Sequence, residues 1–405
     1  MTPVTTASTT LPLASRADLL VGSVIDSSTS LLAQQTHDIV RFAMGSPAAE
    51  AIPTDQLNEA ARSALHGADA FDYAATEGDP PLRTALLEML EGTTDATTAE
   101  RLTITAGGMQ GLDLAAKLFI DPGDLVTVES PTYTNGSATA LAYQAELAEI
   151  PVDEEGMSID ALREAVERAG RTPKLIYTVP TFQNPSGTSM SLTRRQELIG
   201  LAQDWGSVVL DDDPYGMLRF AGEALPSLHE LAEGDPLVFS VRTFSKIIAP
   251  GLRVGWVDAD PSLGQLLIHA KQAMDTCTNL PAQRLVADFL RAGHLEDHLV
   301  TQRQEYRRRK EAMQAALTEH FAGRATWTDP EGGFFLWVSF GDDVDTEALF
   351  EVALAEGVAY IPGNAFSPAR RFPHDLRLCF ASTPPDRIRE GVARLARAVD
   401  SLAQR

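Results

Sequence analysis

Apolar and polar positions in the middle of the chain change repeatedly between short apolar runs and segments with helical spacing. The runs predict strands over residues 102–105, 125–128, 147–150, 174–178, 207–210, 236–241 and 253–257. Helices are predicted between them, and Gly170 and Gly206 mark the ends of those over 159–169 and 193–205. Strand and helix in alternation predict an α/β fold, in which helices cover both faces of a mostly parallel sheet.

The two ends of the chain depart from this alternation. Towards the N-terminus the pattern predicts a helix capped by Thr54 and stopped by Gly67 and a helix over 82–90, while 18–39 is only weakly helical. After about residue 281, an Arg-rich helical run precedes two short β-rich pieces with a helix between them. We read the Arg-rich run as a solvated helix face rather than a binding patch. The expected organisation is an N-terminal arm over 1–50 packing on the small domain, a large domain over 51–285 and a small α+β domain over 286–405.

Composition narrows the possible partners and compartments. The chain has 405 residues, with 33 basic and 56 acidic side chains and a formal charge of −23. This charge disfavours nucleic acid and anionic membranes, which both attract clustered Lys and Arg. The two cysteines, Cys277 and Cys379, lack metal-ligand spacing, and no apolar run has the length of a membrane span. With no basic and apolar leader at the N-terminus, these features predict a cytoplasmic protein.

Chemically distinctive residues follow five of the predicted strands. Because ligands of open α/β sheets bind beyond the carboxyl ends of the strands, these residues are expected to converge at one edge. They are the pair Gly107 and Gly108, then Tyr133, Asn184, Asp212 with Tyr215, and Lys246.

Lys246 is the centre of the predicted site. It comes just after a buried strand, and burial in a pocket makes the neutral amine available as a nucleophile. The hydroxyls of Thr243 and Ser245 and the guanidinium of Arg253 suit a phosphate beside it. An amine next to a phosphate cup is what a phosphorylated aldehyde cofactor requires. For an arbitrary Ser-Lys pair, an exposed lysine in a turn would be the ordinary interpretation.

The other strand ends offer matching functions. Gly107 and Gly108 let backbone N–H groups approach an anion at a helix N-terminus, although a tight turn explains them equally well. No nucleotide-binding fingerprint accompanies them. Asp212 is costly to bury without a cation, and against a ring nitrogen it would keep that nitrogen protonated. Tyr215 and Asn184 can donate to a phenolate-type oxygen, and Tyr133 offers a face for stacking. Asp211 and Asp213 are interpreted as solvated or capping neighbours.

These motifs together resemble a known family. Asn184-Pro-x-Gly187, Asp212-x-x-Tyr215 and Thr243-x-x-Lys246 with Arg253-x-Gly-Trp256 are similar to the signature of fold-type I, class I/II aminotransferases, nearest the aminoadipate and kynurenine-type (aromatic) subgroup. The resemblance covers roughly residues 39 to 390. It implies a large domain with a mostly parallel seven-stranded-type sheet and a smaller α+β domain. It also implies pyridoxal 5′-phosphate as cofactor and transfer of an amino group from an L-amino acid to a 2-oxo acid, through an aldimine on Lys246 and pyridoxamine phosphate.

The resemblance also assigns roles to individual residues. Lys246 would form the Schiff base and move the Cα proton, Asp212 would pair with the ring nitrogen, and Tyr133 would stack on the ring. Asn184 and Tyr215 would contact the ring hydroxyl. The phosphate would be held by the backbone of Gly107, Gly108 and Met109 and by Thr243, Ser245 and Arg253. The substrate would be held by Arg377, which clamps the α-carboxylate, by Asn184 and by the backbone at Gly45.

Further implications concern assembly and specificity. Tyr73 matches a tyrosine that reaches the phosphate of the neighbouring subunit, which implies a homodimer with shared sites. The alternative interpretation of Arg377 is that it forms a structural ion pair and does not bind substrate. Gly108 and Met109 replace the Ser-Gln of many relatives, so one hydroxyl donor is missing. The stretch 27–30, near where aminoadipate-type members place an arginine for a distal carboxylate, is uncharged.

Two alternatives remain open at this point. The motifs bind the cofactor without choosing which bond breaks, so decarboxylation, racemisation, elimination or oxidation could occur on the same fold. A non-enzymatic effector domain of a transcription regulator would require an N-terminal DNA-binding domain. Only about forty residues precede the motifs, and the acidic charge argues against DNA. Neither the amino donor nor the acceptor can be named from the sequence.

Overall fold

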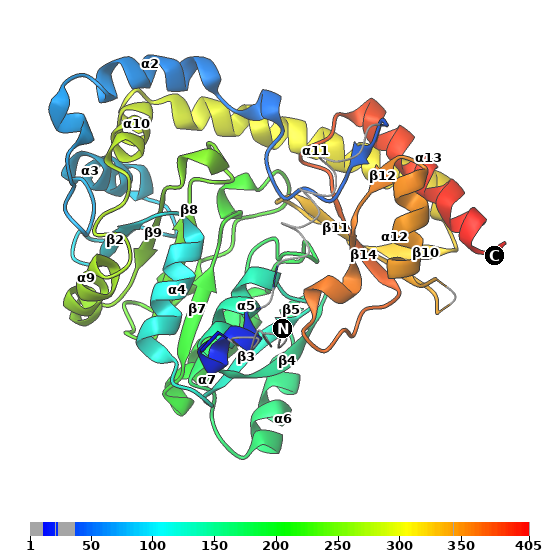
Figure 1. Cartoon of the computed structure of the whole chain (residues 1–405), viewed down its shortest axis with the longest axis horizontal. Coiled ribbons are helices and arrows are strands. Elements are labelled where there is room, and N and C mark those ends of the chain that lie inside the picture. Colours follow the sequence, from blue (N-terminus) through cyan, green and yellow to red (C-terminus); the bar gives the residue numbers. More distant parts are fainter. Residues whose placement is uncertain (1–10, 21, 23–36, 343, 405) are drawn as a thin grey trace, which may run out of the picture.

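A large sheet forms the centre of the molecule (Figure 1). The computed structural model describes residues 11–20, 22, 37–342 and 344–404. Within them, the large sheet has eight strands in the order β2 (Leu102–Thr105), β9 (Gly255–Asp258), β8 (Val238–Thr243), β7 (Val208–Asp212), β6 (Leu175–Thr178), β3 (Leu125–Ser130), β4 (Glu146–Asp153) and β5 (Gly156–Met157). Strands β8, β7, β6, β3 and β4 are parallel neighbours, whereas β9 and β5 run antiparallel. The predicted α/β class is confirmed. The sheet has one strand more than the expected seven, because β5 folds back on β4 and pairs with it.

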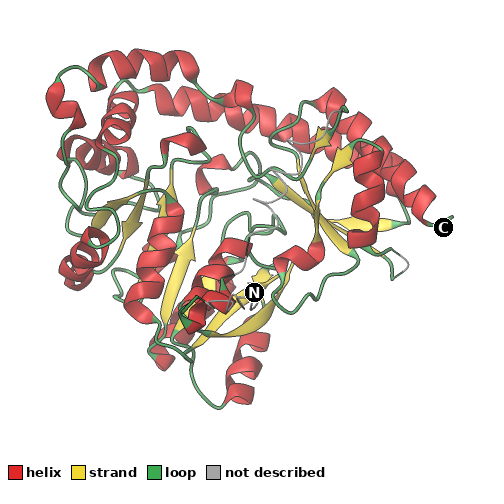
Figure 2. Cartoon of the chain, viewed as in Figure 1, coloured by secondary structure: helices red, strands yellow, loops and turns green. Residues whose placement is uncertain are grey.

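Helices cover both faces of this sheet (Figure 2), as continuously buried strands require. The helices α4 (Gly108–Phe119), α5 (Thr134–Ala142) and α9 (Gly264–Gln272) share one apolar core with the sheet. The helices α6 (Ile159–Ala169), α7 (Leu192–Trp205) and α8 (Leu228–Leu231) share another with it. Gly170 and Gly206 end α6 and α7 in the left-handed conformation, as their positions in the sequence predict.

The smaller sheet is antiparallel, in the order β10 (Ala325–Trp327), β11 (Phe335–Phe340), β14 (Asp375–Cys379) and β13 (Ile361–Pro362). The helices that accompany it are α11 (His294–Phe321), α12 (Thr346–Ala355) and α13 (Pro385–Leu402). Strand β1 (Val40–Arg41) pairs with β12 (Val358–Ala359), so the segment that precedes α2 lies against this smaller part. The remaining helices are α2 (Thr54–Ala64), α3 (Pro80–Leu90) and α10 (Leu280–Arg291).

Several expected boundaries are wrong. Thr54 is the first residue of α2 rather than its cap, and that helix ends at Ala64, before Gly67. Residues 15–19 form a single 3₁₀ turn and 37–39 are not helical, while residues 21 and 23–36 of the weakly helical segment lie outside the described residues. The Arg-rich run lies on α11 and is solvated on one side only, because Arg309 is buried and pairs with Glu50 and Glu305. Among the described helices, none is both long and apolar enough to cross a bilayer.

Candidate active site

A cleft opens at the carboxyl ends of the parallel strands. Strands β2 and β8 both run antiparallel to β9, so β2 points the same way as β3, β6, β7 and β8. The loops that follow these five strands therefore meet at one edge of the sheet. The predicted residues that line the cleft are Gly45, Gly108, Met109, Tyr133, Asn184, Asp212, Tyr215, Thr243, Ser245, Lys246, Arg253 and Arg377.

Lys246 reaches into this cleft from the turn after β8. Its Nζ donates a hydrogen bond of 2.7 Å to the carbonyl oxygen of Gly45. Burial lowers the pKa of the amine to about 8, and the positive charges of Arg377 and Arg253 act in the same direction. Far more of the amine is therefore neutral near physiological pH than in an ordinary exposed lysine, and the neutral form is the one that attacks a carbonyl carbon. The structure does not support the interpretation of Lys246 as an exposed lysine in a turn.

Asp212, the last residue of β7, presents an acidic group to the same cleft. Its Oδ2 accepts a hydrogen bond of 2.9 Å from the hydroxyl of Tyr177 on β6. Burial raises the pKa of Asp212 to about 7; Asp211 and Asp213 also raise it, while Tyr177 and Arg242 lower it. Among the described residues, no lysine, arginine or histidine forms an ion pair with Asp212. A buried carboxylate in this state would be stabilised by a cationic group entering the cleft.

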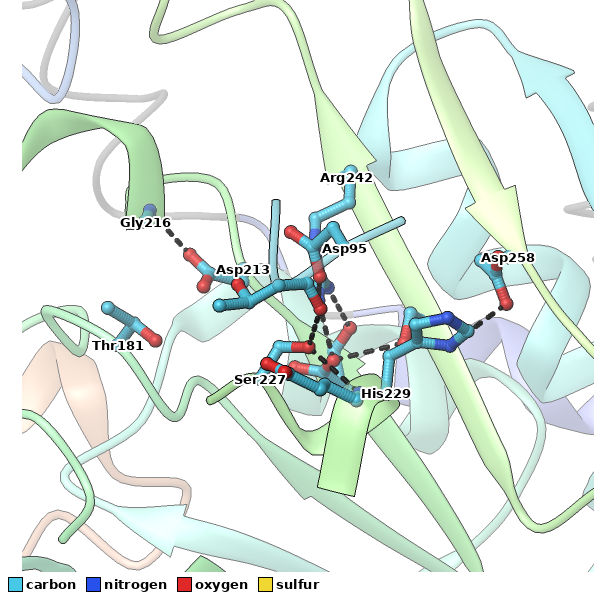
Figure 3. Close-up of polar contacts among 12 residues, drawn as sticks. Asp95, Thr181, Asp213, Gly216, Ser227, His229, Arg242 and Asp258 are labelled. Carbon is cyan, nitrogen blue, oxygen red and sulfur yellow. Dashed lines mark hydrogen bonds and ion pairs between the residues drawn. The ribbon is translucent and has the colours of Figure 1, made fainter. Parts of the chain in front are cut away.

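A network of charged side chains surrounds Arg242 and Asp95, close to Asp213 in the sequence neighbourhood of Asp212 (Figure 3). Arg242 on β8 contacts Asp95 at 2.9 Å and Asp211 at 2.7 Å, and all three groups are largely removed from solvent. The interpretation of Asp211 as a solvated or capping neighbour is therefore wrong, because its carboxylate neutralises a buried guanidinium. Asp213 does cap the next turn, since its Oδ1 accepts from the backbone N–H groups of Tyr215 and Gly216 at 3.0 and 2.7 Å.

Donors for an anion gather at one end of the cleft. The hydroxyl of Thr243 donates to Ser245 Oγ at 2.8 Å, and Arg253 reaches the same oxygen at 3.4 Å and the carbonyl of Ala106 at 3.1 Å. Helix α4 begins at Gly108, so its N-terminal N–H groups face this region. A Cβ on Gly107 would lie 2.5 Å from Arg253 Nη2, so only glycine fits there. Guanidinium, hydroxyls and a helix N-terminus together form a site suited to phosphate.

Arg377 on β14 faces the cleft from the smaller sheet. It is 1% exposed, and its Nη1 and Nη2 donate to Asn184 Oδ1 at 2.9 Å and to the carbonyl of Ala43 at 2.7 Å. The guanidinium lies 4.2 Å from the centre of the Phe335 ring. Within the described part of the chain it pairs with no carboxylate, and its buried Nε has no hydrogen-bond partner. The structural ion pair considered as an alternative is absent there, and the vacant donor suits a carboxylate.

Some predicted residues lie elsewhere, and some important ones were not predicted. Tyr73 is 80% exposed and does not line the cleft of its own chain. The uncharged stretch 27–30 lies outside the described residues. Sequence reasoning missed Tyr177, which it counted as part of an apolar strand, and Arg242, which it placed just after one. A buried tyrosine hydroxyl needs a partner, and that requirement was the available signal for Tyr177.

Comparisons with known proteins agree with this geometry. The family described as "Aminotransferase class I and II" matches residues 37–395. The chain is 38% identical over 371 residues to aromatic-amino-acid aminotransferase 1 of Thermococcus litoralis, covering 90% of this chain and 89% of that protein. It is 38% identical over 373 residues to 2-aminoadipate transaminase of Thermus thermophilus, covering 91% and 92%. The crystal structure of Pyrococcus horikoshii kynurenine aminotransferase in complex with PMP superposes with a TM-score of 0.90 at 35% identity, covering 96% and 97%.

Proposed function

The chain belongs to the class I and II aminotransferases, and from this membership we propose how its own residues carry out the reaction. The enzyme uses pyridoxal 5′-phosphate and moves an amino group from an amino acid to a 2-oxo acid. When bound, the cofactor supplies an aldehyde that carries the amino group and a ring that accepts electrons from the substrate.

The residues of the cleft fit this cofactor. Its phosphate would lie among Thr243, Ser245, Arg253 and the backbone of Gly107, Gly108 and Met109, where the anion donors gather. Its ring nitrogen would face Asp212, while Asn184 and Tyr215 would donate to the ring hydroxyl and Tyr133 would cover the ring. One observation carries the assignment: a buried carboxylate without a cation, at Asp212, shares a cleft with an amine of lowered pKa, at Lys246.

Lys246 has two successive tasks in this proposal. Its neutral amine would hold the cofactor at the aldehyde carbon, with loss of water, until the amino group of a substrate replaces it. The freed amine would then act as the base that accepts the substrate Cα proton and as the acid that gives it back. The carbonyl of Gly45, which accepts from Nζ, holds the amine in the cleft between these tasks.

Arg377 and Asn184 bind and orient the substrate. A substrate carboxylate would be bound by the Arg377 guanidinium, which lines the cleft and pairs with no carboxylate of the described residues. Asn184 already holds the guanidinium at 2.9 Å. A carboxylate fixed at this point restricts rotation about the Cα bonds, so that the Cα–H bond can stand perpendicular to the ring.

The substrate side chain is expected to be neutral. The cations that line the cleft in the described residues are Lys246, Arg253 and Arg377, and each already has a role. The lining also includes Met44, Leu112 and Phe335, which suit an apolar or aromatic group. This agrees with the name of the Thermococcus litoralis relative.

Single-turnover loss of the visible absorbance of bound cofactor across the standard amino acids tests the proposal. L-Phenylalanine and L-leucine are expected to give a 2-oxo acid and one equivalent of pyridoxamine phosphate, faster than L-2-aminoadipate does. Lys246→Ala is expected to abolish turnover. Release of carbon dioxide, racemised amino acid or ammonia without pyridoxamine phosphate would favour another reaction on the same cofactor. Normal turnover by Lys246→Ala would refute the role of Lys246.

A homodimer with shared sites completes the proposal. Tyr73 and Phe71 are 80% and 66% exposed in the single chain, so both aromatic side chains are accessible to a partner subunit. Tyr73 would reach the phosphate of the partner subunit. We also infer a reducing compartment such as the cytoplasm, with which two unpaired thiols are compatible.

A further inference from the structure

Glu129 is a buried carboxylate that the proposed reaction does not use. It lies near the end of β3, is 1% exposed and does not line the cleft. In the described residues its partners are three neutral donors: Thr178 Oγ1 at 2.6 Å, the N–H of Val179 at 3.2 Å and Gln183 Nε2 at 3.0 Å. Burial and the charge of Asp212 raise the pKa of Glu129 to about 7, against the effect of these three hydrogen bonds. An apolar residue would avoid the cost of burying this charge.

The contacts of Glu129 lead to the residue next to Asn184. Gln183 donates through Nε2 to Glu129 and also to the carbonyl of Pro131 at 2.7 Å. Its Oε1 accepts from the N–H and hydroxyl of Ser186 at 2.8 and 2.7 Å. The amide of Gln183 is thus fixed at both ends. Asn184, the next residue, therefore starts from a fixed backbone position.

The same carboxylate also anchors the loop that carries Tyr133. Glu129 begins the segment that runs through Pro131 to Tyr133. The side-chain N–H group of Gln183 donates both to the Glu129 carboxylate and to the carbonyl oxygen of Pro131. Beyond Pro131, the N–H of Thr132 donates to Phe366 O at 2.9 Å, and the Phe366 ring lies 5.1 Å from the Arg377 guanidinium. Both loops thus converge on Arg377.

We propose that Glu129 is a positioning residue, whose carboxylate fixes the loops of Tyr133 and Asn184 relative to each other and so places Asn184 against Arg377. The inference rests on the proposed roles of Asn184 and Arg377 in holding the substrate carboxylate. Glu129 acts through Gln183 and does not touch the reacting atoms. Loss of its acceptor oxygens releases Gln183, and a displaced Asn184 then loses its contact with the guanidinium.

Glu129→Ala and Glu129→Gln, compared with L-phenylalanine as donor, test the inference. Glu129→Ala is expected to raise KM about tenfold, with a smaller change in kcat, because ground-state binding of the carboxylate weakens. The visible spectrum of the bound cofactor should shift as well, since in the proposed function Asn184 would also donate to the ring hydroxyl. Glu129→Gln should restore both properties: its Oε1 can accept from Val179 and Gln183, while its amide group donates to the Thr178 hydroxyl.

Further variants keep the test decisive. Gln183→Ala should reproduce the effect of Glu129→Ala, and the double variant should be no worse than either single one, because both break one path. Thr127→Val, two residues earlier on β3, is the matched control and should behave as wild type. If Glu129→Ala does not fold, judged by circular dichroism, Gln183→Ala carries the same test.

Two results would overturn the inference: wild-type KM and spectrum in the folded Ala variants, or equal damage in Glu129→Gln, which would indicate a role for charge. Wild-type protein that neither binds the cofactor nor reacts with any amino acid would instead contradict the proposed function.

Discussion

Asp212 and Lys246 share one cleft, and burial shifts the pKa of each side chain in the direction that favours its neutral form. The pKa of the carboxyl rises to about 7 and that of the amine falls to about 8. Both shifts follow from the cost of holding a charge away from water. In the cofactor-free site both groups therefore gain and lose protons close to neutral pH, and the protonated ring nitrogen of the cofactor would favour the charged form of Asp212.

The raised pKa of Asp212 predicts how the stability of the cofactor-free protein depends on pH. The folded state keeps this proton up to about pH 7, whereas the unfolded chain loses it near 3.8, the ordinary pKa of an aspartate side chain. The contribution of Asp212 to stability is therefore largest at low pH and is lost as the pH rises towards and through 7. Relative to Asp212→Asn, the free energy of unfolding in urea should fall by about 2–3 kcal/mol between pH 5 and pH 8. A difference that stays constant or grows with pH would contradict this.

Single residues with local signals could be predicted from the sequence, and those whose partners lie far away could not. Lys246 is marked by the hydroxyls just before it and Arg253 just after it. The environment of Asp211 depends on Arg242, which arrives through the neighbouring strand, and so its burial was misjudged. The role proposed for Glu129 likewise depends on its hydrogen bond with Gln183, a residue more than fifty positions away.

At the scale of elements, close packing of α5 on β6 determines where Asp212 is held. Gly136 on α5 faces Tyr177, and a Cβ there would lie 2.4 Å from ring atoms of that tyrosine. The Tyr177 hydroxyl is the donor to Asp212. The glycine thus lets a helix approach the strand that supports the carboxylate.

Gly136→Ala is therefore expected to push the Tyr177 ring and weaken its hydrogen bond to Asp212. Overpacking of this kind costs about 1–3 kcal/mol of stability, measured by urea denaturation. The dissociation constant of the cofactor should rise as well. Gly200→Ala, at an α7 position with no atom within 4 Å of the new Cβ, is the control and should stabilise by about 0.5–1 kcal/mol. Equal effects of the two substitutions would refute the packing argument.

Elements with clear end signals were predicted with accurate bounds. Helix α6 was expected over 159–169 and is found there, because Ser158 caps its start and Gly170 accepts the left-handed conformation at its end. Strand β7 was expected to end at residue 210 but continues to Asp212, since pairing with β8 extends over polar positions. Polar residues at strand ends look like loops in a sequence, and here they form the site.

At the scale of the whole molecule, the two sheets build one site together, and we propose that a second subunit adds to it. Lys246 and Asp212 come from the large sheet and Arg377 from the small one. Tyr73, which is exposed in the single chain, is available to a partner. Sequence periodicity predicts the layers of each sheet but not how two sheets face each other, because long-range side-chain contacts fix that arrangement.

Mixed dimers can show whether Tyr73 serves the partner subunit. Subunits with Lys246→Ala and subunits with Tyr73→Phe are each expected to be impaired, the second through weaker cofactor binding. In a mixed dimer, one site would contain an intact Lys246 and an intact Tyr73 from opposite chains. Activity at limiting cofactor should therefore recover on mixing. No recovery, with mixed dimers confirmed by sedimentation, would contradict a role for Tyr73 in the site of the partner subunit.

The most direct test of the account is reduction of the cofactor-loaded protein with borohydride, followed by peptide mass mapping. The account predicts loss of the visible absorbance and a phosphopyridoxyl mass on the peptide that contains Lys246, with neither change in Lys246→Ala. A label on another lysine, or no label on protein that binds the cofactor, would contradict it.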